Sequence, residues 1–174
     1  MITIDGGTGK IMHNGLNVAS APMVDQWYLT ANKTSDGDCT DLARSNITGA
    51  AAQIGDGMTQ SSGVFTFPTT GKYLIFCAGR FSCNSDDNVN CATSVTLDGG
   101  SSFTVVCYAS DGQNSSGGAR KDGSNTSLYN LDVTDTSQVK VKFVAGSIGS
   151  GSWVQGNSGT YFSTSFTFIR LGDT

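Results

Sequence analysis

Histidine and carboxylate side chains are the groups of this sequence that could act as acids and bases. The single histidine, His13, lies in a glycine-rich segment near the N-terminus. A nucleophile needs a base that is oriented by an acid, and a base in such a segment would have no walls to exclude water. The sequence contains no glutamate. Its clustered aspartates, Asp36 with Asp38 and Asp86 with Asp87, have the surroundings of turns. We therefore expect no enzyme activity.

Metal and phosphate sites are also not predicted. Calcium is the ion that the oxygen-rich loops would favour, although their spacing is not that of an EF-hand. The loop oxygens belong to Asp36, Asp38, Asp86, Asp87, Asn88 and Asn90. One histidine and cysteines on separate segments do not suit zinc. Segment 5–10, DGGTGK, lacks the spacing of a phosphate-binding loop. We therefore expect neither a metal nor another cofactor.

The sequence has five cysteines and no CxxC pair, and an odd number cannot be fully paired within one chain. Two interpretations stay open. Cys83 and Cys91 flank the polar loop NSDDNVN and could form a disulfide. Alternatively, all five are thiols at buried or half-buried strand positions, which is the interpretation that we favour. The five are Cys39, Cys77, Cys83, Cys91 and Cys107.

The charge of the chain argues against nucleic acid and membrane as partners. The net charge is −4, the isoelectric point is about 4.6, and the lysines and arginines are scattered. Nucleic-acid binding needs a clustered basic footprint. No apolar run approaches the roughly 20 residues that span a bilayer. The first ten residues, MITIDGGTGK, have neither a basic start nor an apolar stretch, so we expect no secretory signal peptide and synthesis in a cytoplasm.

The elements that would position any site are strands. Glycine is abundant (23 of 174 residues) and the apolar residues alternate with polar ones. This pattern predicts strands over residues 23–30, 64–67, 73–81, 92–97, 102–109, 126–133, 138–146 and 159–172. Residues 111–125 read as a polar loop. Eight or more short strands with no helical pattern predict an all-β, two-sheet antiparallel jelly-roll sandwich over residues 23–174, preceded by an N-terminal docking arm over residues 1–22.

The order of these signals resembles the jelly roll of the tumour necrosis factor (TNF)-like and complement globular-head superfamily, from Met23 to Leu171. The matching pieces are an aromatic-turn-Gly-x-Tyr entry to a central strand, a Leu-x-x-Leu hairpin, the closing strand, and a tryptophan in the first strand. They are carried by Phe65, Phe67, Gly71 and Tyr73, by Leu128, Leu131, Asp135 and Val139, by Phe162, Ser163, Phe166 and Phe168, and by Trp27. The sequence departs from the family at Thr164, where a glycine is usual, and it has no collagen stalk.

The resemblance implies a homotrimer, because domains of this family typically pack apolar side chains about a three-fold axis. By resemblance, the trimer interface would contain Tyr73, Phe162, Phe166 and Phe168. The segment MVDQWYLT of the first strand also resembles segments of virion proteins from marine phages. We therefore expect a non-enzymatic structural protein on the surface of a phage virion, either a capsid decoration (cement) protein or a short head fibre.

The expected partner of this protein is the major capsid protein or another virion protein. Ile2, Ile4, Ile11 and Met12 of the arm would dock on it. The alternative is a fibre-head module that binds a receptor or a host-surface glycan. That alternative requires exposed aromatic residues such as Tyr108 or Trp153, rather than aromatic residues that fill the core.

Overall fold

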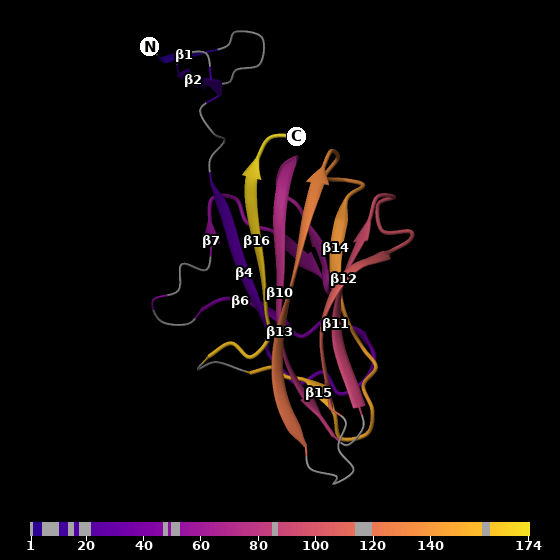
Figure 1. Cartoon of the computed structure of the whole chain (residues 1–174). Helices are drawn as coiled ribbons and strands as arrows, with labels where there is room; N and C mark the ends of the chain where they lie inside the picture. The colour runs from indigo at the N-terminus through magenta and orange to yellow at the C-terminus, as the bar shows by residue number, and fades with distance from the viewer. Residues whose placement is uncertain are drawn as a thin grey trace.

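The structure is a computed structural model that describes residues 2–4, 11–13, 16–17, 22–46, 49, 53–84, 87–113, 120–157 and 161–174. Two antiparallel sheets pack face to face and form a sandwich, and a third, small sheet lies beyond one end of it (Figure 1). No helix long and apolar enough to cross a membrane occurs among the described residues.

The first layer of the sandwich is a seven-stranded sheet in the order β13-β10-β16-β4-β6, with β15 paired to β10 and β7 paired to β4. Its strands are β4 (Met23–Leu29), β6 (Leu42–Arg44), β7 (Gln53–Ile54), β10 (Gly71–Cys83), β13 (Lys121–Val133), β15 (Trp153–Val154) and β16 (Ser165–Gly172). Sequence neighbours are separated in this order, so the chain crosses repeatedly between the two layers.

The second layer is a six-stranded sheet in the order β12-β11-β14-β9-β8, with β5 paired to β14. Its strands are β5 (Gly37–Asp38), β8 (Thr59–Ser61), β9 (Val64–Thr66), β11 (Asp87–Thr96), β12 (Thr104–Gln113) and β14 (Lys140–Gly146). The predicted all-β, two-sheet antiparallel jelly-roll sandwich is confirmed.

Aromatic side chains from both sheets form the centre of the core. The ring of Phe143 on β14 stacks on that of Phe166 on β16, with centroids 3.9 Å apart. Phe65 on β9 meets Trp27 on β4 edge-on, at 5.3 Å. Such aromatic pairs contribute roughly 0.5–1.5 kcal/mol each beyond the area that they bury. The two layers are therefore held together mainly by aromatic contacts between β14 and β9 on one side and β16 and β4 on the other.

The two ends of the polar loop predicted over residues 111–125 are strand, where the structure describes them. β12 continues to Gln113 and β13 begins at Lys121. The prediction was wrong because the first half of β13 is largely exposed along the edge of its sheet, so its sequence shows no apolar alternation. β11 likewise begins at Asp87, inside the stretch that we expected to be a loop between Cys83 and Cys91.

The N-terminal segment contains a small sheet of its own. Strands β1 (Ile2–Ile4), β2 (Ile11–His13) and β3 (Leu16–Asn17) pair in that order, and Ile4 lies opposite Ile11. Figure 1 shows β1 and β2 beyond the end of the sandwich at which β4 begins. The side chains of Ile2, Ile4, Ile11 and Met12 lie outside the described residues, so docking through them stays a prediction.

Candidate assembly surface

The central strand β10 is apolar on both of its faces. Its residues Tyr73 and Ile75 point into the sandwich and are at most 1% exposed. Leu74 and Phe76, which alternate with them, point to the other face of the sheet and are only half-buried. No described strand layer packs on that outward face, because the two layers of the sandwich pack on each other and the small third sheet lies beyond their end.

The strand register aligns the outward side chains into a continuous row. Leu74 on β10 lies opposite Ile169 on β16, Ile169 lies opposite Val24 on β4, and Val24 lies opposite Ile54 on β7. Cross-strand neighbours of this kind are about 5 Å apart at Cβ and contact one another. Four aliphatic side chains thus cross four strands without a polar residue between them.

A second row adds aromatic and aliphatic surface beside the first. Phe76 lies opposite Leu128 on one side and Thr167 on the other, and Leu128 is 51% exposed. The six apolar residues of the two rows are referred to below as the outward apolar face. They are Val24, Ile54, Leu74, Phe76, Leu128 and Ile169.

The assignment of Tyr73, Phe166 and Phe168 to a trimer interface is corrected. All three are 0% exposed in the single chain and lie in the core. A side chain with no exposed surface has nothing to offer a neighbouring subunit. The hydroxyl of Tyr73 also donates a hydrogen bond of 2.8 Å to the carbonyl oxygen of Thr69, within its own chain.

Phe162, the fourth predicted interface residue, differs from the other three. It is half-buried, and its ring packs on that of Tyr28 at 5.0 Å. Tyr28 alternates along β4 with the inward-facing Trp27 and Leu29, so this pair lies on the outward side of the seven-stranded sheet. A subunit contact through Phe162 stays a prediction.

One long edge of the sandwich is closed by a buried ion pair. The carboxylate of Asp25, 0% exposed, accepts hydrogen bonds from Arg44 Nε at 2.8 Å, from Trp27 Nε1 at 2.9 Å and from the Met58 amide at 2.7 Å. Arg44 Nη2 donates to the Met58 carbonyl oxygen at 2.6 Å. This cluster, called the Asp25 clip below, holds the chain where it passes from β7 to β8.

The cysteines do not form the predicted alternative disulfide. Cys91 is a thiol, and the Cys83 thiol donates a hydrogen bond to the Asp111 carbonyl oxygen at 3.5 Å. Cys39, Cys77 and Cys91 are completely buried. Contact with the Cys91 thiol, together with burial, raises the pKa of the Cys39 thiol. The raised pKa values of Cys39 and Cys91 leave these two buried thiols with little thiolate character.

The aspartates that we considered for calcium are used by the fold where the structure describes them. Asp36 Oδ1 accepts a hydrogen bond from the Ile148 amide at 2.8 Å, and Asp38 forms a 3.0 Å ion pair with Lys142. Asp86 lies outside the described residues. No group of three or more metal-ligating side chains converges among the residues that the structure describes.

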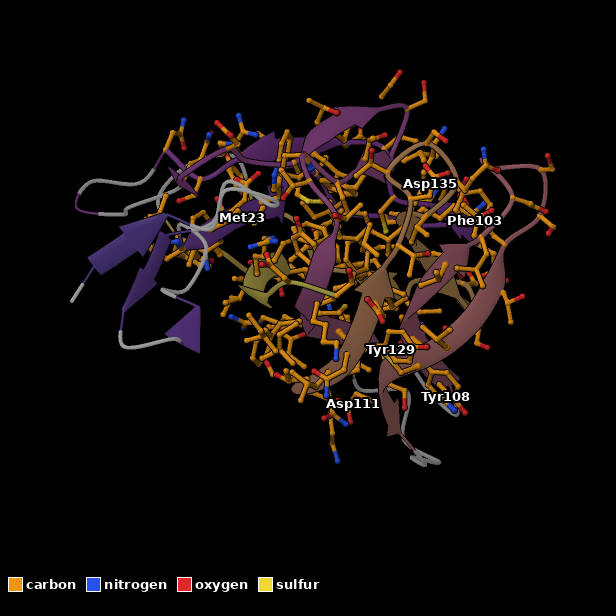
Figure 2. All side chains as sticks on the ribbon, turned by 90° about the horizontal axis from the view of Figure 1, so that it is seen from above. Met23, Phe103, Tyr108, Asp111, Tyr129 and Asp135 are labelled. Atoms are coloured by element: carbon orange, nitrogen blue, oxygen red, sulfur yellow. The ribbon has the colours of Figure 1, made fainter. Side chains whose placement is uncertain are left out.

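The two aromatic residues proposed for glycan recognition are placed differently. Tyr108 on β12 is 62% exposed and lies on the flank of the sandwich in Figure 2. Trp153 is half-buried, and the guanidinium of Arg120 lies over its ring at 4.4 Å. One face of Trp153 is therefore already occupied, whereas Tyr108 is available to a ligand.

The outward apolar face was missed at the level of sequence, although the sequence contains a signal for it. The segment GKYLIF carries apolar residues at consecutive positions rather than at alternate ones, and Ile169 directly follows Phe168 in the closing strand. Such a run is typical of a strand that is apolar on both faces. By resemblance we assigned the interface to the larger aromatic residues, whereas the strand register places them inside.

Comparison with known proteins supports the fold. No protein-family model and no curated protein matches the sequence. Among solved structures, that of the Eiger TNF from S. frugiperda is similar with a TM-score of 0.64 at 12% identity, covering 89% of this chain and 96% of that one. A structure of murine APRIL is similar with a TM-score of 0.59 at 11% identity, covering 86% of this chain and 99% of that one. The chain therefore has a TNF-like jelly-roll fold.

Proposed function

We propose that this protein is a non-enzymatic structural module that works as a homotrimer and joins a larger particle through its N-terminal segment. The outward apolar face carries the proposal. Six apolar side chains lie on an uncovered sheet face, and two of them, Ile54 and Leu128, are 44% and 51% exposed. Covering apolar surface stabilises an assembly by about 25 cal/mol per Å², so a neighbouring subunit is the occupant that this face favours.

The TNF-like fold supports three copies, because domains of the family that the sequence resembles typically form trimers. In a three-fold ring, every contact is between two different surfaces of the subunit, and the ring closes on itself. The outward apolar face would supply one of these two surfaces.

The trimer is tested by light scattering of the purified protein at micromolar concentration. The mass of the wild-type protein should be about three times the chain mass of 18.0 kDa. Leu74→Asp and Ile169→Asp each place a charge in the aliphatic row and should yield the monomer mass. Val105→Asp is the matched control, because Val105 is 53% exposed but lies on β12 of the other sheet. A wild-type monomer would refute the trimer.

The particle that we propose is a phage virion, in which the trimer is a capsid decoration protein or a short head fibre. The resemblance of the first strand to virion proteins supports this role, as does the small sheet β1-β2-β3, which pairs with no described strand of the sandwich. Its docking partner would be the major capsid protein or another virion protein.

Removal of residues 1–22 tests the docking step. The shortened protein should remain a folded trimer, because β4 starts at Met23 and the described core residues all lie at or after it. It should no longer bind particles that lack the wild-type protein. If it binds them at the wild-type level, the docking surface is on the jelly roll itself.

A glycan-binding fibre head is the second candidate, and the exposure of Tyr108 is the observation that favours it. Exposed tyrosines bind sugars by stacking against their apolar faces, as they do with other ligands. In a glycan array, a specific signal that Tyr108→Ala removes would support this function. Particle binding without any glycan signal would support the decoration protein.

A further inference from the structure

One end of the sandwich, the end at which the N-terminal segment joins it, is formed by four turns and the close of β16. Strand β4 begins there at Met23, and Arg170, near the end of β16, lies opposite Met23. β10 starts and β13 ends at the same level. This end is called the arm end below and comprises residues 55–58, 67–70, 97–103, 134–139 and 171–174. Figure 1 shows it beside the N-terminal segment, and Figure 2 looks down on it.

Only a short piece of chain separates the small sheet from the arm end. β3 ends at Asn17 and β4 begins at Met23. Six steps of fully extended chain span at most about 22 Å. Neighbouring strands are about 4.8 Å apart, so the path β13-β10-β16-β4-β6 is itself about 20 Å wide. A protein that holds β3 therefore lies within about one sheet width of the arm end.

Leu97 is an apolar side chain that a braced turn holds out from the arm end. It is 69% exposed. The Thr96 hydroxyl donates a hydrogen bond to the Asp98 carboxylate within this turn. The Gly99 amide donates a 2.9 Å hydrogen bond to the Gln138 carbonyl oxygen, which joins the turn to the neighbouring turn 134–139. Because the backbone is already fixed, binding of Leu97 by a partner costs little ordering of the chain.

Leu171 is a second exposed apolar side chain, and a β-bulge places it. Lys72 lies opposite Gly172 and Tyr73 lies opposite Arg170, so Leu171 is an extra residue in β16. Bulges re-aim side chains away from the regular pattern of a strand. Leu171 is 58% exposed and borders a hollow of about 410 Å³. The two most exposed large aliphatic side chains of the described residues are thus both at the arm end.

The turns of the arm end are acidic, since they contain aspartates and neither lysine nor arginine. Their aspartates are Asp56, Asp98, Asp135 and Asp173. Two basic residues of the adjoining strands reach these turns. Arg170 pairs with Asp173 at 2.7 Å, and the Lys140 ammonium donates a hydrogen bond to the Gly99 carbonyl oxygen. Acid remains in excess, so a surface that complements the arm end is basic.

We propose that the arm end docks on the same protein of the particle that holds the N-terminal segment. The contact surface of that protein would have apolar recesses for Leu97 and Leu171, with basic residues around them. This inference rests on the proposed function, because it needs a partner that holds residues 1–22. The N-terminal segment anchors the protein, and the arm end fixes its orientation on the particle.

Binding of the full-length chain to particles that lack this protein tests the apolar contact. Leu97→Asp and Leu171→Asp should each weaken binding at least about tenfold, because each removes a buried apolar contact and puts a charge in its place. Tyr161→Asp is the matched control, since Tyr161 is 51% exposed but precedes β16, at the opposite end of the sandwich. Its affinity should be that of the wild type. All three variants should keep the wild-type mass in light scattering.

A charge reversal tests the basic character of the partner surface. Asp56→Lys should weaken binding about threefold, because a charge near the surface contributes modestly. Asp41→Lys is the control, since Asp41 is also exposed but lies beside Thr30, past the other end of β4. Binding of the wild-type protein should weaken as the ionic strength rises.

The outcomes separate this inference from the proposed function. If the wild-type protein does not bind the particles, the proposed function fails. If the wild-type protein binds and both leucine variants bind equally well, docking is confined to the N-terminal segment and the role of the arm end is refuted. A monomer mass for either leucine variant would place that leucine in a subunit contact, which also refutes docking through it. Tighter binding of Asp56→Lys would show that the partner surface is acidic and overturn the predicted complementarity.

Discussion

The Asp25 carboxylate and the Arg44 guanidinium form an ion pair of 2.8 Å in which the acid is 0% exposed and the arginine 36% exposed. The acid accepts further hydrogen bonds from Trp27 Nε1 and from the Met58 amide. The pair thus joins strand β4 to a backbone position 33 residues away in the sequence.

Replacing Asp25 by asparagine should destabilise the fold by about 3 kcal/mol, because four donor groups, two of them from the partly exposed Arg44, would then face a neutral amide with only one acceptor oxygen. Urea denaturation measures the loss. Asp122→Asn is the control, since its 3.4 Å pair with Arg80 is largely exposed and should contribute no more than about 1 kcal/mol. Equal losses in the two variants would contradict the importance of the Asp25 clip.

Alkylation should distinguish Cys107 from the buried cysteines. Cys107 is half-buried, whereas Cys39, Cys77 and Cys91 have no exposed surface. The raised pKa of Cys39 further lowers its reactivity, because the thiolate is the nucleophile. Mass spectrometry after brief treatment of the native protein with iodoacetamide should find the label on Cys107 alone. The melting temperature with and without reductant should agree within about 2 °C, since no disulfide needs to be broken.

The lowered pKa values of two aspartates should make stability depend on pH in the acid range. A hydrogen bond from Ser82, followed by the contact with Arg80, lowers the pKa of Asp122, and hydrogen bonds from Ser137 lower that of Asp135. When the folded-state pKa of an aspartate lies below its unfolded-state pKa, near 3.9, the ionised carboxylate adds to the free energy of unfolding. This addition is complete above the unfolded-state pKa and is lost as the pH falls through the folded-state pKa. The free energy of unfolding should therefore stay nearly level from about pH 7 to about pH 5 and fall below about pH 4. Asp122→Asn should make the fall shallower.

Two glycines allow backbone strain to be separated from steric contact. Gly63 has φ +82° and Gly49 has φ +81°. A Cβ at Gly63 would lie 2.5 Å from the Cys39 carbonyl oxygen, whereas a Cβ at Gly49 would meet nothing within 4 Å. Gly49→Ala should thus cost only the strain of the left-handed backbone, about 1 kcal/mol. Gly63→Ala should cost at least about 2 kcal/mol more. If the two variants lose similar amounts of unfolding free energy in denaturation experiments, the backbone near Cys39 moves to make room for the added Cβ.

Strands with strong alternation could be predicted from the sequence. The side that faces the core could not be predicted for a strand that is apolar on both sides. The pattern VKVKF correctly predicted β14, whose Val141 and Phe143 are buried while Lys140 and Lys142 point outward. In β10 both faces are apolar, so sequence alone could not tell which of its residues face the core. Only the pairing of β10 with β16 shows that Leu74 and Ile169 share the outward side.

The Asp25 clip was beyond sequence analysis for a different reason. Asp25 occupies an inward position of β4, where a charged residue is rare unless its charge is paired. Its partners, Arg44 and Met58, come from separate segments that no local pattern links to it. The only sequence signal was an aspartate at an inward position. It predicts that the carboxylate has a buried partner, but it does not identify that partner.

The end strands of the two sheets, β12 and β13, have a consequence for the behaviour of the protein at high concentration. Unpaired strand edges are templates on which further chains can add as fibrils. Here the exposed first half of β13 begins with the charged residues Lys121 and Asp122, and the register between β11 and β12 shifts at Thr93. Charges and irregular pairing both oppose edge-to-edge addition. Concentrated solutions of this protein should therefore contain particles of fixed size rather than growing, dye-binding fibres.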